Sequence, residues 1–140
     1  MNNTPLTIHT DGGSRGNPGP AAAAFVVERG SELVFQGSKF LGNVTNNFAE
    51  YSGVLIALEW VLSSEIPAED LQINFVLDSE LVVRQINGLY KVKDLNLQKL
   101  FQEVKKLISE TGKKIVFSNV PRNQNKLADL LVNEELDRNI

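Results

Sequence analysis

The sequence of 140 residues has no cysteine, one histidine and no long apolar run. Without cysteine the chain has no disulfide framework, no thiolate metal site and no cysteine nucleophile. No apolar stretch approaches the roughly 20 residues that a membrane-spanning helix needs. The first 13 residues have neither the basic nor the apolar region of a secretory signal. We therefore expect a cytoplasmic protein with no membrane partner.

The composition is that of a folded globular protein. Hydrophobic side chains make up 42% of the chain and charged ones 22%, which excludes an intrinsically disordered chain. This length matches one domain and supplies enough apolar side chains for one core. We therefore expect a single domain over residues 1–140, and nothing in the composition predicts more than a monomer.

The net charge of −3 hides an uneven distribution of charge. Ten basic and three acidic residues lie between Arg84 and Lys126, so this segment carries +7 and the rest of the chain −10. Such a segment fits a polyanionic partner, although a solvated, lysine-rich helix face explains the same pattern.

The hydrophobic pattern switches between the strand period and the helix period. Strands are predicted at 6–10, 21–28, 33–41, 71–77 and 114–120. Helices are predicted from 45–47 up to Pro67, over 80–87, from Asp94 to Gly112, and from Asn125 towards the C-terminus. A tight turn at 29–31 makes the first three strands an antiparallel meander, and the glycine-rich segment 11–20 is predicted to be irregular. The order βββαβααβα predicts an α/β fold with a five-stranded mixed sheet flanked by helices.

Four carboxylates occupy unusual positions in this pattern. Two follow predicted strands, one borders the apolar face of a helix, and one lies in the first turns of the last helix: Asp11, Asp78, Glu50 and Asp129. Taken singly, Asp11 suits an Asx-turn and Asp78 an N-cap. Glu50 suits the dipole at a helix start, and Asp129 an ordinary helix surface.

Taken together, the four carboxylates indicate a metal site. Asp11 and Asp78 lie side by side if their strands are neighbours, and ligands of α/β sheets bind beyond the carboxyl ends of the strands. Like charges at that distance repel by several kcal/mol in a partly desolvated site. Shared protons or divalent cations relieve this repulsion. Oxygen ligands favour Mg²⁺ or Mn²⁺, and two such ions suit in-line phosphoryl displacement.

Four segments carry further patterns: 10–20 (TDGGSRGNPGP), 45–51 (TNNFAEY), Asp78-Ser79 followed by 83–88 (VRQING), and 125–129 (NKLAD). In this order they resemble the four motifs of type 1 ribonucleases H. The resemblance covers essentially the whole chain, and the predicted order of elements matches the ribonuclease H-like fold. It implies a single ribonuclease H-like domain.

The resemblance also implies an activity and a set of site residues. The activity is that of an endoribonuclease, which hydrolyses the RNA strand of RNA/DNA hybrids by a two-metal-ion mechanism and leaves 5′-phosphate and 3′-hydroxyl ends. Two Mg²⁺ ions, for which Mn²⁺ substitutes, would be held by the catalytic carboxylates Asp11, Glu50, Asp78 and Asp129. Glu50 would also bind an RNA 2′-hydroxyl, the group that distinguishes RNA from DNA. Substrate contacts are implied for Gly12, Gly13, Ser14, Arg15, Gly16, Asn17, Thr45, Asn46 and Asn47, with Thr45 in a pocket for a DNA phosphate.

One departure from the family pattern concerns histidine. Members of the family often have a histidine in a loop before the last carboxylate, and here that short segment has none. Arg122 lies in this segment and is the candidate replacement. The single histidine of the chain, His9, is predicted to be a structural residue of its strand.

Two further departures concern the contacts to the nucleic acid. Glu80 stands where a glutamine often reads the minor groove of the hybrid. The segment 88–94 leaves no room for the basic protrusion of some members and resembles the protrusion-less branch of the family. Lys91 and Lys93 are then the expected contacts to the DNA backbone.

Two other interpretations stay open. A non-catalytic module that binds hybrids or RNA fits Glu80 and the missing loop histidine, but it gains nothing from four clustered carboxylates beside phosphates. A related two-metal nuclease is the second alternative, and it makes double-stranded RNA an additional candidate substrate.

Overall fold

The computed structural model describes residues 4–140, so the first three residues of the predicted domain lie outside it. It contains one five-stranded sheet in the order β3-β2-β1-β4-β5. The strands are β1 (Leu6–Ser14), β2 (Gly19–Arg29), β3 (Glu32–Val44), β4 (Gln72–Leu77) and β5 (Lys114–Asn119). The helices are α1 (Asn46–Ser63), α2 (Glu80–Ile86), α3 (Leu95–Thr111) and α4 (Lys126–Asn139), with a short 3₁₀ helix at Arg122–Gln124. The predicted fold class and the order βββαβααβα are confirmed.

The strands pair as expected for a meander followed by crossovers. β1 is antiparallel to β2 and parallel to β4, and β5 is parallel to β4. Two residues join β2 to β3, and Gly30 takes a positive φ of 62° there, which suits glycine in a tight turn. Because β1 and β4 run in the same direction side by side, the residues at their carboxyl ends meet at one edge of the sheet.

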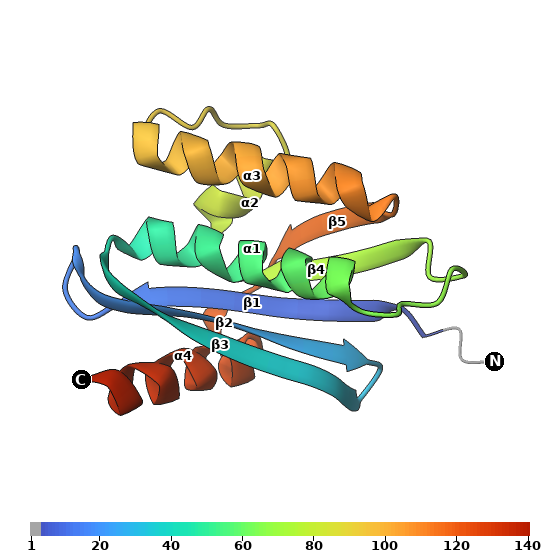
Figure 1. Cartoon of the computed structure of the whole chain (residues 1–140), viewed down its shortest axis with the longest axis horizontal. Helices are drawn as coiled ribbons and strands as arrows, with labels where there is room; N and C mark the ends of the chain where they lie inside the picture. Colours follow the sequence, from blue (N-terminus) through green and yellow to red (C-terminus); the bar gives the residue numbers. More distant parts are fainter. Residues whose placement is uncertain (1–3) are drawn as a thin grey trace.

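Helices cover both faces of the sheet (Figure 1). α1 and α3 lie on one face over the larger core, whose fully buried members include Ile8, Tyr51 and Phe75. α4 covers the other face, where it packs on the alanine-rich part of β2. Among residues 4–140, no helix is long and apolar enough to cross a bilayer.

The glycine-rich segment differs from its prediction as an irregular loop. β1 continues to Ser14, and Asp11 to Ser14 pair in register with Ala24 to Ala21 of β2. Only residues 15–18 lie outside the two strands. The glycines serve close packing: a Cβ on Gly12 would clash with the backbone of Ala49, and one on Gly53 would clash with the backbone of Asp11. The backbones of β1 and α1 therefore approach closely, which brings Asp11 and Glu50 together.

Candidate active site

Three carboxylates from three elements meet at the carboxyl ends of the central strands. Asp11 on β1, Glu50 on α1 and Asp78 after β4 each place one oxygen within 4.8 Å of the others. The parallel pairing of β1 and β4 and the close approach of α1 produce this cluster. Asp11 and Glu50 are only 3% and 5% exposed, and Asp78 is partly buried. Asp11 and Asp78 therefore lie close together, as the sequence predicts.

The local structure excludes the simpler explanations of these three carboxylates. Ser79, not Asp78, is the N-cap of α2, and its hydroxyl accepts a hydrogen bond from the Val82 amide. Glu50 lies beyond the first turn of α1, which contains no acidic residue. Asp11 lies inside β1 rather than in a turn. None of these three side chains therefore caps its own helix or stabilises a turn.

Burial and mutual repulsion dominate the electrostatics of the cluster. Burial, reinforced by the charge of Asp78, raises the pKa of Asp11 to about 7. Burial also raises the pKa of Glu50 well above its usual value, and the charges of Asp11 and Asp78 raise it further. The interaction between the two carboxyl groups lowers the pKa of Asp11 and raises that of Glu50. The pKa of Asp78 is raised by burial, although Arg122 and a hydrogen bond from Asn125 oppose the shift.

The cluster has the properties that a hard divalent cation requires. Glu50 Oε2 and Asp78 Oδ2 are buried and have no hydrogen-bond partner. A buried, unpartnered carboxylate oxygen is costly unless a cation or a proton neutralises it. Carboxylate oxygens are the ligands that Mg²⁺ and Mn²⁺ prefer. The residues present therefore fit such an ion.

Asp129 lies beside this cluster, outside the group of three. It lines a cavity of about 110 Å³ together with Asp11 and Arg122. Its Oδ1 is 3.7 Å from Nη2 of Arg122. The charge of Asp129 contributes to the raised pKa values of Asp11 and Asp78. Asp129 lies in the first turn of α4.

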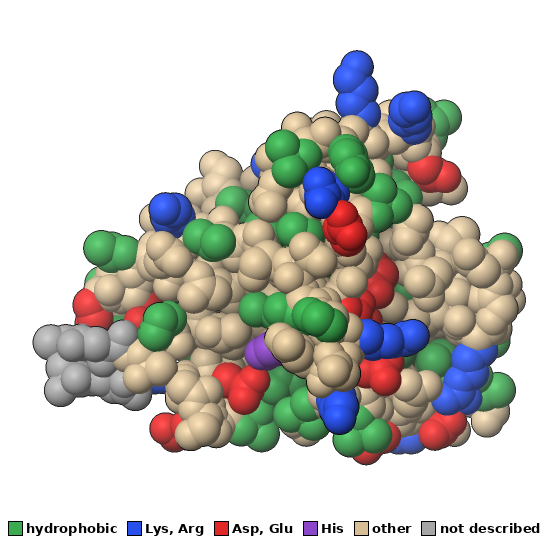
Figure 2. All heavy atoms as spheres, turned by 180° about the vertical axis from the view of Figure 1, so that it is seen from behind, with side chains coloured by type: hydrophobic (Ala, Val, Ile, Leu, Met, Phe, Trp, Pro, Cys, Tyr) green, Lys and Arg blue, Asp and Glu red, His purple; other side chains and the backbone are tan. Residues whose placement is uncertain are grey.

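Arg122 is the cation that faces the acidic cluster. It begins the 3₁₀ helix before α4 and has a side chain that is 79% exposed. It lines an open cleft of about 290 Å³ with Asn46, Glu50, Asp78 and Ser79. Figure 2 shows acidic and basic side chains side by side in the middle of one face of the molecule. A guanidinium at the mouth of this cleft is placed to meet a phosphate.

The segment after Asp11 is held against the start of α1. The Ser14 amide donates to Asn46 Oδ1 at 3.2 Å, and the Asn46 amide donates to Asn17 Oδ1 at 2.9 Å. Gly12 and Gly13 line the same cavity as Asp129. Gly16 takes a positive φ of 93° in the turn between the strands. Gly12, Gly13, Ser14 and Asn46 thus line the cavity beside Asp11, and Asn17 is held against the start of α1.

Arg15 belongs to the same segment but points to another partner. Its guanidinium makes an ion pair with Asp137 of α4 at 2.7 Å and hydrogen bonds to Asn133. The side chain is 41% exposed. A contact between Arg15 and a nucleic acid would therefore compete with this exposed ion pair.

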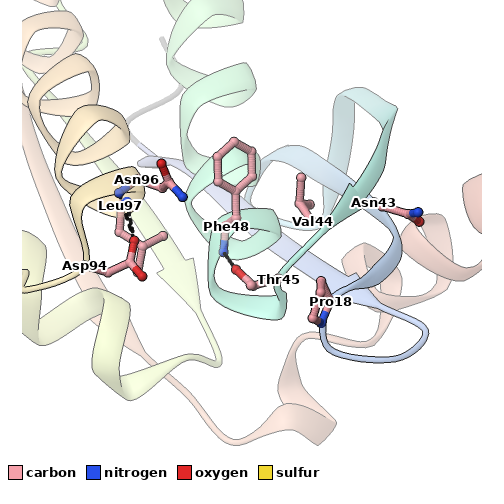
Figure 3. Close-up of a pocket in the computed structure, with 8 residues that line it drawn as sticks. All are labelled: Pro18, Asn43, Val44, Thr45, Phe48, Asp94, Asn96 and Leu97. Carbon is pink, nitrogen blue, oxygen red and sulfur yellow. Dashed lines mark hydrogen bonds between the residues drawn. The ribbon is translucent and has the colours of Figure 1, made fainter.

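Thr45 lies in a separate pocket of about 260 Å³ between the starts of α1 and α3. Figure 3 shows Thr45 and Phe48 between Asp94 and Asn96 on one side and Pro18, Val44 and Asn43 on the other. The Thr45 hydroxyl caps α1 by accepting from the Phe48 amide. The Asp94 carboxylate caps α3 by accepting from the Asn96 and Leu97 amides. The pocket predicted for a DNA phosphate thus contains a carboxylate at its α3 side.

The remaining predicted contacts lie on α2 and in the following loop. Glu80 makes an exposed ion pair with Arg84 at 2.7 Å. Arg84 also stacks on the ring of Tyr90 at 5.5 Å. Lys91 and Lys93 are exposed in the short segment between α2 and α3. Asn47 is half-buried at the start of α1, next to the exposed Asn46.

Two residues next to the site have no functional signal of their own in the sequence. His9 was predicted to be a structural strand residue, and its ring nitrogens do contact Asn125 and Glu28. Asn125 was recognised only as the first residue of a motif, yet it is 2% exposed and donates to the Thr10 carbonyl at 2.9 Å. A buried amide between two elements has no signal in sequence periodicity, because its partners lie 115 and 116 positions away.

Known proteins similar to this chain share its sequence and its fold. A sequence family described as reverse transcriptase-like matches residues 9–135. Ribonuclease HI of Halobacterium salinarum is 36% identical over 128 residues, which are 91% of this chain and 62% of that protein. The bifunctional protein Rv2228c of Mycobacterium tuberculosis is 37% identical over 134 residues, 94% of this chain and 35% of that protein. The chain thus spans about a third of the mycobacterial relative.

Solved structures extend the similarity to nearly the full length of both chains. LC11-RNase H1 in complex with an RNA/DNA hybrid is 38% identical and has a TM-score of 0.88, with 95% of this chain and 97% of that chain covered. RNase H1 from Halobacterium salinarum is 34% identical and has a TM-score of 0.87, with 95% of this chain and 98% of that chain covered. With its sheet order, its motifs and these relatives, the chain belongs to the type 1 ribonuclease H family.

Proposed function

We propose that this protein is a ribonuclease H that hydrolyses the RNA strand of RNA/DNA hybrids with two divalent metal ions. The observation that carries the proposal is the cluster of Asp11, Glu50 and Asp78, with two buried carboxylate oxygens that lack a partner. A pure binding surface for phosphates gains nothing from such a cluster, because it repels a polyanion. The complex of a similar protein, LC11-RNase H1, with an RNA/DNA hybrid supports the choice of substrate.

The carboxylates would hold the metal ions. Asp11, Glu50 and Asp78 provide the central oxygens, and Asp129 stands next to them across the cavity that it shares with Asp11. Mg²⁺ ions held by these residues would provide an activated water and stabilise the leaving oxygen, and we expect Mn²⁺ to substitute for them. The products then carry 5′-phosphate and 3′-hydroxyl ends. Glu50, which lines the open cleft, would also bind a 2′-hydroxyl.

Other side chains would hold the substrate. Arg122 binds the phosphate next to the cut bond, where a loop histidine acts in other members. The backbone of residues 12–16 approaches the RNA strand, since glycine leaves its amides accessible. Asn17, Asn46 and Asn47 contact the sugars and the minor groove, and Thr45 contacts a DNA phosphate. Lys91 and Lys93 hold the DNA backbone, with a strength that falls as salt rises.

Glu80 fits this proposal because its charge is compensated. The ion pair with Arg84 leaves a nearly neutral polar pair on the exposed face of α2. Such a pair still presents a carboxylate oxygen to the amino group of guanine in a minor groove. Arg15 would contact RNA only by giving up its exposed bond to Asp137, which costs about 1 kcal/mol or less.

We further propose a single domain that works as a cytoplasmic monomer. The continuous sheet with helices on both faces supports a single domain. Light scattering behind a sizing column tests the monomer. A second peak at twice the mass would contradict it.

The decisive experiment compares matched duplexes. Labelled RNA/DNA, RNA/RNA and DNA/DNA duplexes of one sequence are incubated with Mg²⁺, Mn²⁺ or EDTA. We expect cleavage of the RNA strand of the hybrid in either metal and none in EDTA, with the ends mapped by ligation and phosphatase treatment. Binding of the hybrid without metal-dependent cleavage would favour the non-catalytic module. Equal cleavage of RNA/RNA would make double-stranded RNA a second substrate.

A further inference from the structure

The single histidine holds a buried amide beneath the acidic cluster. Nδ1 of His9 on β1 lies 3.2 Å from Oδ1 of Asn125. Nε2 of the same ring lies 3.2 Å from Oε1 of Glu28 on β2. Both ring nitrogens therefore face oxygen acceptors, and these two contacts fix the orientation of the imidazole. Its side chain is 22% exposed, so the ring lies mostly within the protein.

Asn125 connects this histidine to the metal-binding side of the sheet. Its Nδ2 donates to the carbonyl of Thr10, the residue before Asp11, at 2.9 Å. The same amide opposes the rise in the pKa of the Asp78 carboxyl. An amide nitrogen donates and an amide oxygen accepts, so the bond from Nδ2 to Thr10 leaves the oxygen for His9. The amide is 2% exposed, and water offers it no alternative partner.

The backbone of Asn125 holds the two residues on the other side of the cleft. The Asp129 amide donates to the Asn125 carbonyl at 3.2 Å, and the Asn125 amide donates to the Arg122 carbonyl at 3.0 Å. Asn125 is thus the point at which the segment with Arg122 and the first turn of α4 attach to β1. In the described part of the chain, no other side chain hydrogen-bonds the Thr10 carbonyl.

The orientation of the amide depends on His9. If the Asn125 amide rotated by half a turn, its oxygen would face the Thr10 carbonyl, and this contact would become repulsive. A hydrogen bond from Nδ1 to Oδ1 favours the observed orientation and opposes the rotated one. A ring of the same shape without a donor leaves the amide oxygen buried and unpartnered.

We propose that His9 is a positioning residue, which acts through Asn125 to hold Asp129 and Arg122 in register with Asp11 and Asp78. The inference rests on the proposed ribonuclease activity for its functional consequence. The connection itself, from His9 to Asn125 to Thr10, is independent of that activity. His9 does not contact the substrate or the metal ions in this proposal, so its effect is on the geometry of the groups that do.

Three variants test the proposal. His9→Phe keeps an aromatic ring and removes the donor. His9→Asn keeps an amide N–H close to the position of Nδ1 and serves as the rescue variant. Gln124→Ala is the matched control, because Gln124 lines the same small cavity as His9 and its side chain makes no hydrogen bond within residues 4–140. Each protein is assayed for kcat and KM on a hybrid, for Mg²⁺ binding by calorimetry, and for exchange of the Asn125 side-chain amide by NMR without metal.

We expect His9→Phe to lower kcat and weaken Mg²⁺ binding by about tenfold each, with the KM for the hybrid nearly unchanged, because groups that orient metal ligands have effects of this size. The exchange of the Asn125 amide hydrogens should speed up in the same variant. His9→Asn should recover most of kcat, and Gln124→Ala should match the wild type in every measurement.

Two results would overturn the proposal. The first is a His9→Phe protein whose kcat, Mg²⁺ affinity and Asn125 exchange all match the wild type. The second is a His9→Asn protein that is as impaired as His9→Phe, since the donor at Nδ1 would then be irrelevant. Failure of the proposed function looks different: the wild type would not cleave the hybrid, while the exchange measurement would still report on the His9–Asn125 contact.

Discussion

The carboxylates at the two ends of the β1–β4 strand pair have opposite surroundings. At the carboxyl ends of β1 and β4, Asp11, Glu50 and Asp78 crowd together with two oxygens unpartnered. At the other ends of the same strands, Asp70 receives two hydrogen bonds from the Arg29 guanidinium, at 3.2 and 2.7 Å. Its backbone carbonyl also accepts from Nζ of Lys113 at 2.7 Å.

The pKa values of the two ends move in opposite directions. Hydrogen bonds from Arg29 lower the pKa of Asp70, whereas burial raises the pKa of Asp11 to about 7. A paired carboxylate stabilises the fold as an anion, and a crowded one destabilises it unless a proton or a cation joins it. One end of the sheet therefore pairs its carboxylate with a cationic side chain, which stabilises the fold, whereas the carboxylates at the other end are available to bind a cation.

The largest expected effect comes from Asp78→Asn at the acidic end. We expect cleavage of the hybrid to be abolished, because the substitution removes a central oxygen ligand and its charge. The free energy of unfolding in EDTA should stay equal or rise, because one of the crowded charges is gone. A cleavage assay and urea unfolding measure the two quantities. If the Asp78→Asn protein still cleaved the hybrid, Asp78 would not belong to the active site, and the contrast between the two ends of the sheet would be wrong.

The matched substitution at the other end is Asp70→Asn. We expect it to lower the free energy of unfolding by about 2 kcal/mol, because it leaves the mostly buried guanidinium of Arg29 without its paired anion. Cleavage of the hybrid should be unchanged. Urea unfolding measures the free energy of unfolding, and the cleavage assay measures the activity on the hybrid. Loss of activity with unchanged stability would show that this end also serves the reaction.

The pH dependence of stability in EDTA separates the two ends further. Asp11 binds its proton more tightly in the folded state, so its contribution is complete below the unfolded pKa near 3.8 and is lost as pH rises towards 7. Asp70 has a lowered pKa, so its contribution is complete above the unfolded pKa and is lost as pH falls through the folded one. Asp11→Asn should flatten the decline towards pH 7, and Asp70→Asn should flatten the decline in acid. Thermal unfolding in EDTA across this range gives both curves, and the same slope in the wild type and in Asp11→Asn would contradict the assignment.

The smallest effect is expected at the exposed ion pair of α2. Glu80→Gln removes an anion that already has Arg84 as its partner. We expect hybrid binding to tighten by less than about threefold at low salt and not at all at high salt, because exposed charges are screened. Fluorescence anisotropy at two salt concentrations, in EDTA, measures the change. An effect as large as that of Asp78→Asn would place Glu80 in the site itself.

The course of the chain through the sheet was predictable from local patterns. Period-two runs such as residues 71–77 and caps such as Thr45 mark strands and helix starts. The parallel pairing of β1 and β4 follows from a crossover, and it brings Asp11 next to Asp78 as expected. The extent of β1 was predicted wrongly, because glycines at 12 and 13 are typical of loops and here serve the close approach of α1.

The sequence by itself determined which side chains are available: four spaced carboxylates, no thiolate, and glycines where two backbones meet. Only the tertiary structure decided how they are used. It placed three carboxylates in one cluster and Asp129 beside it, and it joined His9 to Asn125 across 116 positions. The physical reason is that periodicity and caps depend on neighbours along the chain, whereas distances between functional groups depend on how whole elements pack.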